Sequence, residues 1–156
     1  FAGIEPTSYM SIGVRNPYTR FISQYFFYPD LFGRMLTVQQ CLREIASTPH
    51  LNHKHRVRAI LPNMMWMRLT DWRSLATGPI KVIRFEHLAQ DARRVYGIKE
   101  LPHLRKTYTP TVNDWLAVYN NHLTEFNDLL ADDFHNFGYT MYHHIDDLLN
   151  YFIPDA

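Results

Sequence analysis

The clearest hydrophobic pattern in the chain is a pair of short apolar runs, each followed by a segment with helical spacing. Residues 9–14 (YMSIGV) and 80–85 (IKVIRF) are rich in β-prone side chains and predict strands. Pro17 suits the first turn of a helix after the first run, and Gly97 suits the end of a helix after the second. Because the order of strand and then helix occurs twice, the pattern predicts an α/β fold with neighbouring parallel strands.

The rest of the chain is predicted to be mainly helical. Apolar residues recur at helical spacing in four further segments, which are 37–47 with Thr37 as N-cap, 56–69 with an interruption at Pro62, 112–120 and 124–137. Two strands alone make a poor sheet, so further strands are expected upstream or on a partner. We expect one domain over residues 1–139, followed by a C-terminal tail over residues 140–156.

Composition narrows the class of protein. The chain has 156 residues, 46% of them hydrophobic and 20% charged, which is typical of one globular domain. A net charge of +1 gives no general electrostatic reason to bind nucleic acid or an anionic membrane. The single cysteine, Cys41, excludes an internal disulfide, and no apolar stretch is long enough to predict a membrane span.

The residues that point most specifically to a binding site follow the first predicted strand. Arg15 stands at the strand end, and Ser23 comes eight residues later in the predicted helix. A guanidinium is a planar set of donors that matches phosphate oxygens, and the amides of a helix N-terminus would reinforce such a site. Arg15 could equally pair with a carboxylate of the core.

The run SIGVRNPYTRFISQYFFY, which contains both residues, resembles the 3′-phosphate motif of sulfotransferases that use 3′-phosphoadenosine 5′-phosphosulfate (PAPS). The resemblance implies that Arg15 and Ser23 hold the 3′-phosphate of PAPS or of its product PAP. Arg20 matches a further arginine of the motif, for which a structural salt bridge is expected. The segment IKVIRFEHLAQD is similar to a strand and helix of the same family, especially its carbohydrate-type branch, and implies a structural role for Glu86.

Two other segments resemble the family in part. LPHLRKTYTP is similar to the loop that closes over the nucleotide, which makes Arg105, Lys106 and Thr107 candidates for cofactor binding; a solvated basic turn is the alternative. LPNMMWMRL looks like a degraded form of a family helix that keeps Asn63 but has Met65 where glutamine is usual. This departure weakens any claim of substrate contact there.

A fourth match, DDFHNFGY, resembles the C-terminal signature of the family, in which Asp133, Phe137 and Tyr139 have mainly structural roles. Together the matches span residues 11–139 in the family's order. They imply an incomplete sulfotransferase-like, P-loop-type parallel sheet with helices and a mainly helical C-terminal half.

The resemblance also predicts what the chain lacks. In this family the glycine- and lysine-containing loop for the 5′-phosphosulfate and the catalytic base lie upstream of the arginine motif, but the 14 residues before Arg15 contain no basic residue. We therefore expect no catalytic residue in this chain and no turnover by the chain alone. No metal is expected either, because His50, His53 and His55 have no cysteine or carboxylate at matching spacing; like His143 and His144, they are interpreted as surface residues.

Two functions remain open. In the first, the chain is part of a sulfotransferase-like enzyme that transfers sulfonate from PAPS to a hydroxyl of a glycan or similar acceptor, completed by a missing N-terminal segment or another subunit. In the second, it is a catalytically inactive, sulfotransferase-derived subunit of a larger assembly. A phosphate-binding protein without catalysis ranks last, because a site for one phosphate would leave most of the ligand in water.

Overall fold

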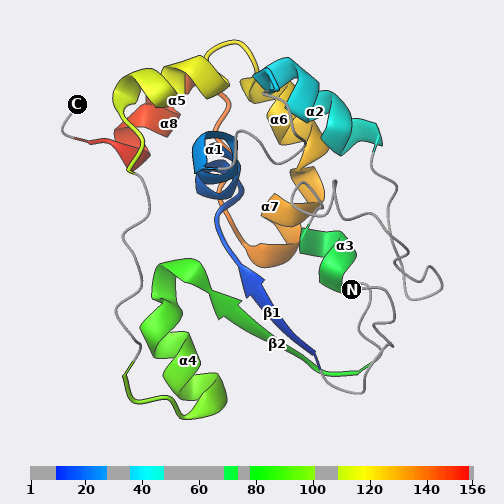
Figure 1. Ribbon diagram of the computed structural model, residues 1–156, viewed down its shortest axis with the longest axis vertical. Helices are drawn as coiled ribbons and strands as arrows, with labels where there is room; N and C mark the ends of the chain where they lie inside the picture. Colours follow the sequence, from blue (N-terminus) through cyan, green and yellow to red (C-terminus); the bar gives the residue numbers. More distant parts are fainter. Residues whose placement is uncertain (1–9, 28–35, 48–68, 74–77, 101–108, 155–156) are drawn as a thin grey trace.

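The computed structural model describes residues 10–27, 36–47, 69–73, 78–100 and 109–154. A two-stranded parallel sheet lies at one end of the molecule, and a group of helices lies at the other (Figure 1). The elements are β1 (Met10–Val14), α1 (Pro17–Phe27), α2 (Val38–Ser47), α3 (Leu69–Arg73), β2 (Ile80–Arg84), η2 (Phe85–His87), α4 (Leu88–Tyr96), α5 (Val112–Tyr119), α6 (Leu123–Leu129), α7 (Ala131–Phe137) and α8 (Ile145–Phe152).

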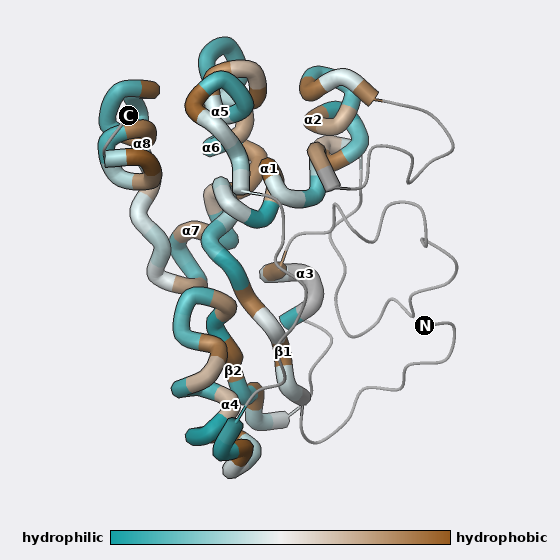
Figure 2. Tube along the Cα trace, turned by 60° about the vertical axis from the view of Figure 1, so that its left-hand side comes forward, coloured by the Kyte–Doolittle hydropathy of each residue, from teal (hydrophilic) through white to brown (hydrophobic). Residues whose placement is uncertain are grey.

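The sheet confirms the two predicted strands and their direction. β1 pairs with β2 in parallel, with Met10 opposite Ile80 and Val14 opposite Arg84. α3 contacts β1 and α4 packs along β2, on opposite sides of the strands (Figures 1 and 2). The predicted second strand is one residue too long, because Phe85 already belongs to the 3₁₀ turn η2 that leads into α4.

Local interactions define the ends of several helices, and the sequence predicts two of them, at Thr37 and Gly97. Thr37 caps α2, since Gln40 N donates to Thr37 Oγ1 at 3.2 Å and Thr37 N donates to Gln40 Oε1 at 2.9 Å. α4 ends at Gly97, which has a φ of 68° and so occupies the left-handed region that favours glycine. At the start of α1, Tyr18 N donates to Asn16 Oδ1 at 3.0 Å, immediately after β1 ends.

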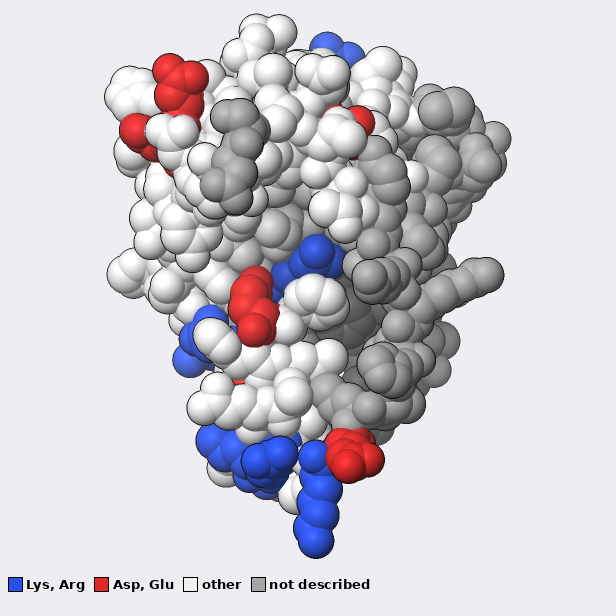
Figure 3. Space-filling model, turned by 90° about the vertical axis from the view of Figure 1, so that its left-hand side faces the viewer, with Lys and Arg blue, Asp and Glu red and all other residues white. Residues whose placement is uncertain are grey.

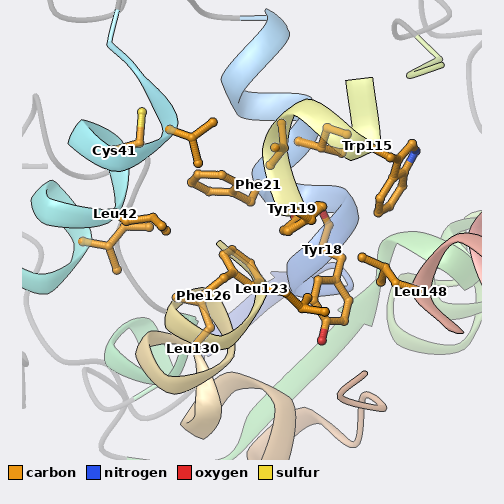
Figure 4. Packing of buried hydrophobic residues seen from close by; sticks show 14 of the residues in the cluster. Tyr18, Phe21, Cys41, Leu42, Trp115, Tyr119, Leu123, Phe126, Leu130 and Leu148 are labelled. Atoms are coloured by element: carbon orange, nitrogen blue, oxygen red, sulfur yellow. The ribbon is translucent and has the colours of Figure 1, made fainter. Parts of the chain in front are cut away.

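The main core lies among the helices and is strongly aromatic (Figure 4). Tyr18 is fully buried at its centre, 5.4 Å from the ring of Tyr119 in an edge contact and 5.5 Å from the ring of Phe126 in a stacked one. α2 contributes its predicted apolar face, with Cys41 and Leu42 in the same cluster. The core therefore joins α1, which continues directly from β1, to the C-terminal helices.

The helix predicted over residues 124–137 is divided in two. The chain leaves helical geometry at Leu130, with φ −106° and ψ 12°, so that α6 ends before it and α7 begins after it. The apolar stripe nevertheless stays buried, because Phe126, Leu130, Phe134 and Phe137 are each at most 4% exposed. Of the helix predicted over residues 56–69, all but the last residue lies outside the described residues.

The segment that we expected as a tail contains a helix, α8, which packs against the core. Leu148 is 0% exposed. Phe152 stacks on Trp115 of α5 with ring centroids 4.7 Å apart. No helix within the described ranges has the length and apolar character required to cross a membrane.

A prediction follows from the buried hydroxyl of Tyr18. This hydroxyl donates to Asn127 Oδ1 at 2.6 Å and accepts a hydrogen bond from Tyr142 N at 2.9 Å, and burial raises the pKa of Tyr18 to about 12. Tyr18→Phe is expected to cost about 1–3 kcal/mol in the free energy of unfolding, because it leaves the buried amide oxygen of Asn127 and the partly buried Tyr142 N without this partner. Urea denaturation measures the effect. Tyr151→Phe, at a ring that is 63% exposed, is the control and should change stability little.

Candidate functional site

Arg15 lies at the carboxyl end of the sheet, directly after β1, as predicted. Its Nε donates to Thr19 Oγ1 at 3.2 Å, and its guanidinium carbon lies 4.3 Å from the centroid of the Phe85 ring. Burial lowers the pKa of Arg15, and the charge of Glu86 opposes that shift. The guanidinium is thus held between the first turn of α1 and η2, the turn that follows β2.

Arg15 precedes α1, whereas Thr19 and Ser23 lie within it. Thr19 and Ser23 are four residues apart, which corresponds to a rise of about 6 Å along the helix axis. The guanidinium reaches Thr19, one turn short of Ser23. Thr19 was not predicted as a site residue, although its place midway between the two predicted residues is a signal that could have identified it.

A pocket of about 280 Å³ opens beside Arg15 at this edge of the sheet. The described residues that line it include two arginines and no acidic residue; they are Gly13, Val14, Arg15, Arg20, Ile83, Phe85 and Leu88. In Figure 3 basic and acidic side chains lie side by side in the middle of the face, beside a hollow. Ligands of open α/β sheets bind at the carboxyl ends of the strands, so the position and charge of this pocket suit an anion.

Glu86 lies next to the pocket but does not line it. Its Oε1 accepts a hydrogen bond from Asn16 N at 2.6 Å, and its Oε2 accepts one from the Tyr139 hydroxyl at 2.9 Å. Burial raises the pKa of Tyr139, and the hydrogen bond to Glu86 raises it further. Glu86 therefore joins the start of α1 to the C-terminal part of the chain, which agrees with the structural role expected for it.

Arg20 and Asp133 lie deeper than Arg15. The fully buried carboxylate of Asp133 accepts hydrogen bonds from Leu69 N at 2.9 Å, from Thr70 N at 2.8 Å and from Thr70 Oγ1 at 2.7 Å, at the start of α3. Burial lowers the pKa of Arg20, and the charge of Asp133 opposes that shift. Asp133 thus has the structural role that the resemblance implied, and its charge acts on Arg20.

Several predicted site residues lie outside the described residues. These are Arg105, Lys106 and Thr107 of the closing loop, together with Asn63, Met65 and the histidines at positions 50, 53 and 55. His143 and His144 are exposed just before α8. Within the part of the chain that the structure describes, no group of three or more metal-ligating side chains comes together.

Comparison of the chain with protein-family models, with curated proteins and with solved structures gives no match. The described part of the chain has a mixed α/β fold that is mostly helical and contains a two-stranded parallel sheet. At the carboxyl edge of that sheet lies a pocket whose lining includes two arginines.

Proposed function

We propose that this chain is part of a PAPS-dependent, sulfotransferase-like protein and that its Arg15 pocket receives the 3′-phosphate of the nucleotide. The observation that carries the proposal is the pocket itself: Arg15 and Arg20 line it at the carboxyl end of the sheet, and no described acidic residue lines it. Two guanidinium groups in one lining suit a phosphate dianion, with the charges of Glu86 and Asp133 acting on them from outside the lining.

The surroundings of Arg15 suit this role. The hydrogen bond to Thr19 uses Nε, one of the five N–H donors of the guanidinium, and fixes the plane of the group. Phe85, which is 48% exposed, also lines the pocket, and the Arg15 guanidinium lies over its ring. This cation–π contact further fixes the guanidinium beside the pocket.

The complete reaction of the proposed protein is the transfer of a sulfonate group from PAPS to a hydroxyl of a glycan or similar acceptor. Besides the 3′-phosphate site, this reaction needs a cradle for the 5′-phosphosulfate and a base for the acceptor proton. In the proposal these groups come from a segment that precedes this chain or from another subunit. The closing loop with Arg105, Lys106 and Thr107 is proposed to complete the nucleotide site.

The alternative is an inactive subunit of a larger assembly in which Arg15 only stabilises the fold. One observation favours it. Glu86 Oε1 accepts a hydrogen bond from Asn16 N at the start of α1, so a carboxylate of the chain already uses an amide that a bound anion could otherwise use.

Calorimetric titration with PAP distinguishes the two functions. Arg15→Ala is expected to weaken PAP binding by about 1.5–3 kcal/mol, the usual contribution of a hydrogen bond to a charged group, and Ser23→Ala to weaken it by less. Arg94→Ala is the matched control, because Arg94 is exposed on α4 and does not line the pocket. If the unaltered chain does not bind PAP, or if Arg15→Ala binds it equally well, the inactive subunit becomes the better proposal.

A further inference from the structure

A second and larger cavity lies beside the start of α1. It measures about 430 Å³, which is in the range of small-molecule sites, and it shares no described lining residue with the Arg15 pocket. The turn before α1, the end of β2 with η2, and α8 contribute its walls, with Asn16, Arg84, Glu86 and Tyr151 among the lining residues. The function proposed above does not use this cavity.

Asn16 brings to the cavity a buried donor that has no partner. The residue is only 8% exposed. Its Oδ1 accepts a hydrogen bond from Tyr18 N at 3.0 Å, so the other end of the side-chain amide is the Nδ2 donor. Within the described part of the chain, no atom accepts a hydrogen bond from this Nδ2. Because buried polar groups are almost always paired, an acceptor oxygen inside the cavity would complete the site.

Arg84 supplies further donors to the same lining. One of its terminal nitrogens donates to the Phe137 carbonyl at 2.8 Å, and its guanidinium lies over the ring of Tyr139 at 5.4 Å from the centroid. These contacts fix the position of the guanidinium, which has five N–H donors in all. Together with Asn16 Nδ2, it suits a carboxylate of a ligand.

Glu86 places a negative charge close to these donors. Its two oxygens accept hydrogen bonds from Asn16 N at 2.6 Å and from the Tyr139 hydroxyl at 2.9 Å, and about one acceptor position stays open on each. Arg84 and Glu86 thus both contact Tyr139, yet the described residues show no ion pair between the two. A simple anion would be repelled by Glu86, whereas a ligand that carries both charges can pair with both residues.

Tyr151 provides an apolar surface in the lining. Its ring is 63% exposed, yet it is held against its neighbours, 4.9 Å from the ring of Phe152 and 5.5 Å from that of Tyr142. An exposed aromatic ring in a fixed orientation binds an apolar group at little cost in conformational entropy.

We propose that this cavity binds a free, zwitterionic amino acid with an apolar side chain. The carboxylate of the ligand accepts hydrogen bonds from Asn16 Nδ2 and Arg84, its ammonium group donates to Glu86, and its side chain packs on Tyr151. The site does not require a nucleotide in the Arg15 pocket, so it stands independently of the function proposed above.

The test is a calorimetric titration of the full chain with three matched probes. L-phenylalanine carries both charged groups, whereas 2-phenylethylamine lacks the carboxylate and 3-phenylpropanoate lacks the ammonium group. L-phenylalanine should bind saturably, and each of the other two should bind about tenfold more weakly or worse, because each leaves one charged partner unused. Equal binding of the three probes would overturn the proposal, and so would absence of saturable binding of L-phenylalanine.

Glu86→Gln tests the site from the side of the protein. Glutamine keeps an oxygen that accepts from Asn16 N but removes the charge, so the affinity for L-phenylalanine should fall about tenfold or more. Glu100→Gln is the matched control, because Glu100 is exposed and does not line the cavity. Equal affinities of these two variants would contradict the proposed pairing with the ammonium group.

Asn16→Asp is a second variant, which keeps the oxygen that accepts from Tyr18 N and removes only the Nδ2 donor. It is expected to weaken L-phenylalanine binding by a similar factor, while circular dichroism stays unchanged. Unaltered binding by this variant would overturn the role of Asn16. PAP binding is measured separately through Arg15→Ala, so failure of one proposal is distinguishable from failure of the other.

Discussion

Asp133→Ala is expected to lower the free energy of unfolding by about 3–5 kcal/mol, the range found when one partner of a buried charged network is removed. Asp133 is 0% exposed and accepts three hydrogen bonds from Leu69 and Thr70. Alanine would leave the two amides at the start of α3 without this partner and would remove the charge that acts on Arg20. Urea denaturation followed by circular dichroism measures the change.

Asp132→Ala is the control for this result. Asp132 is the preceding residue in the first turn of α7, but its side chain is exposed. Its loss should cost only the few tenths of a kcal/mol, up to about 1, typical of an acidic residue near a helix N-terminus. Equal effects of the two substitutions would show that the hydrogen bonds of Asp133 do not stabilise the fold.

Leu148→Ala should also destabilise the chain strongly, by about 2–5 kcal/mol. Leu148 belongs to α8 and is 0% exposed within the same core as Tyr18 and Trp115. Truncation to alanine removes apolar contacts and leaves a cavity that the surrounding rings fill only in part. Thermal and urea unfolding of the full chain test this expectation.

Asn150→Ala gives the comparison on the same helix, because Asn150 is exposed and its substitution should change stability by at most about 0.5 kcal/mol. If Leu148→Ala were as mild, α8 would not be a part of the cooperative core. Residues 145–152 would then behave as the tail that the sequence suggested.

Glu86 lines a cavity of about 430 Å³ next to the Arg15 pocket. Its carboxylate holds Asn16 at the start of α1 and Tyr139 before α8, and it is not among the described residues that line the Arg15 pocket. Its charge nevertheless acts on Arg15, as the charge of Asp133 acts on Arg20. An anion in the Arg15 pocket therefore has to compete with these two carboxylates for the guanidinium groups.

Elements that depend on neighbouring residues could be predicted from the sequence alone. The two strands, the N-cap Thr37 of α2 and the terminal Gly97 of α4 were all predicted, because β-propensity, capping hydrogen bonds and a positive φ are local properties. The place of Arg15 at the carboxyl end of the sheet followed from the same local order of strand and helix.

Features that depend on distant partners were decided by the tertiary structure. The break at Leu130 and the packing of α8 follow from how the C-terminal helices meet the core, which helical spacing does not reveal. The bond from Asn16 to Glu86 joins residues 70 apart, and that from Leu69 to Asp133 joins residues 64 apart. Such pairs form only where the fold brings buried donors and acceptors together, since each must find a partner away from water.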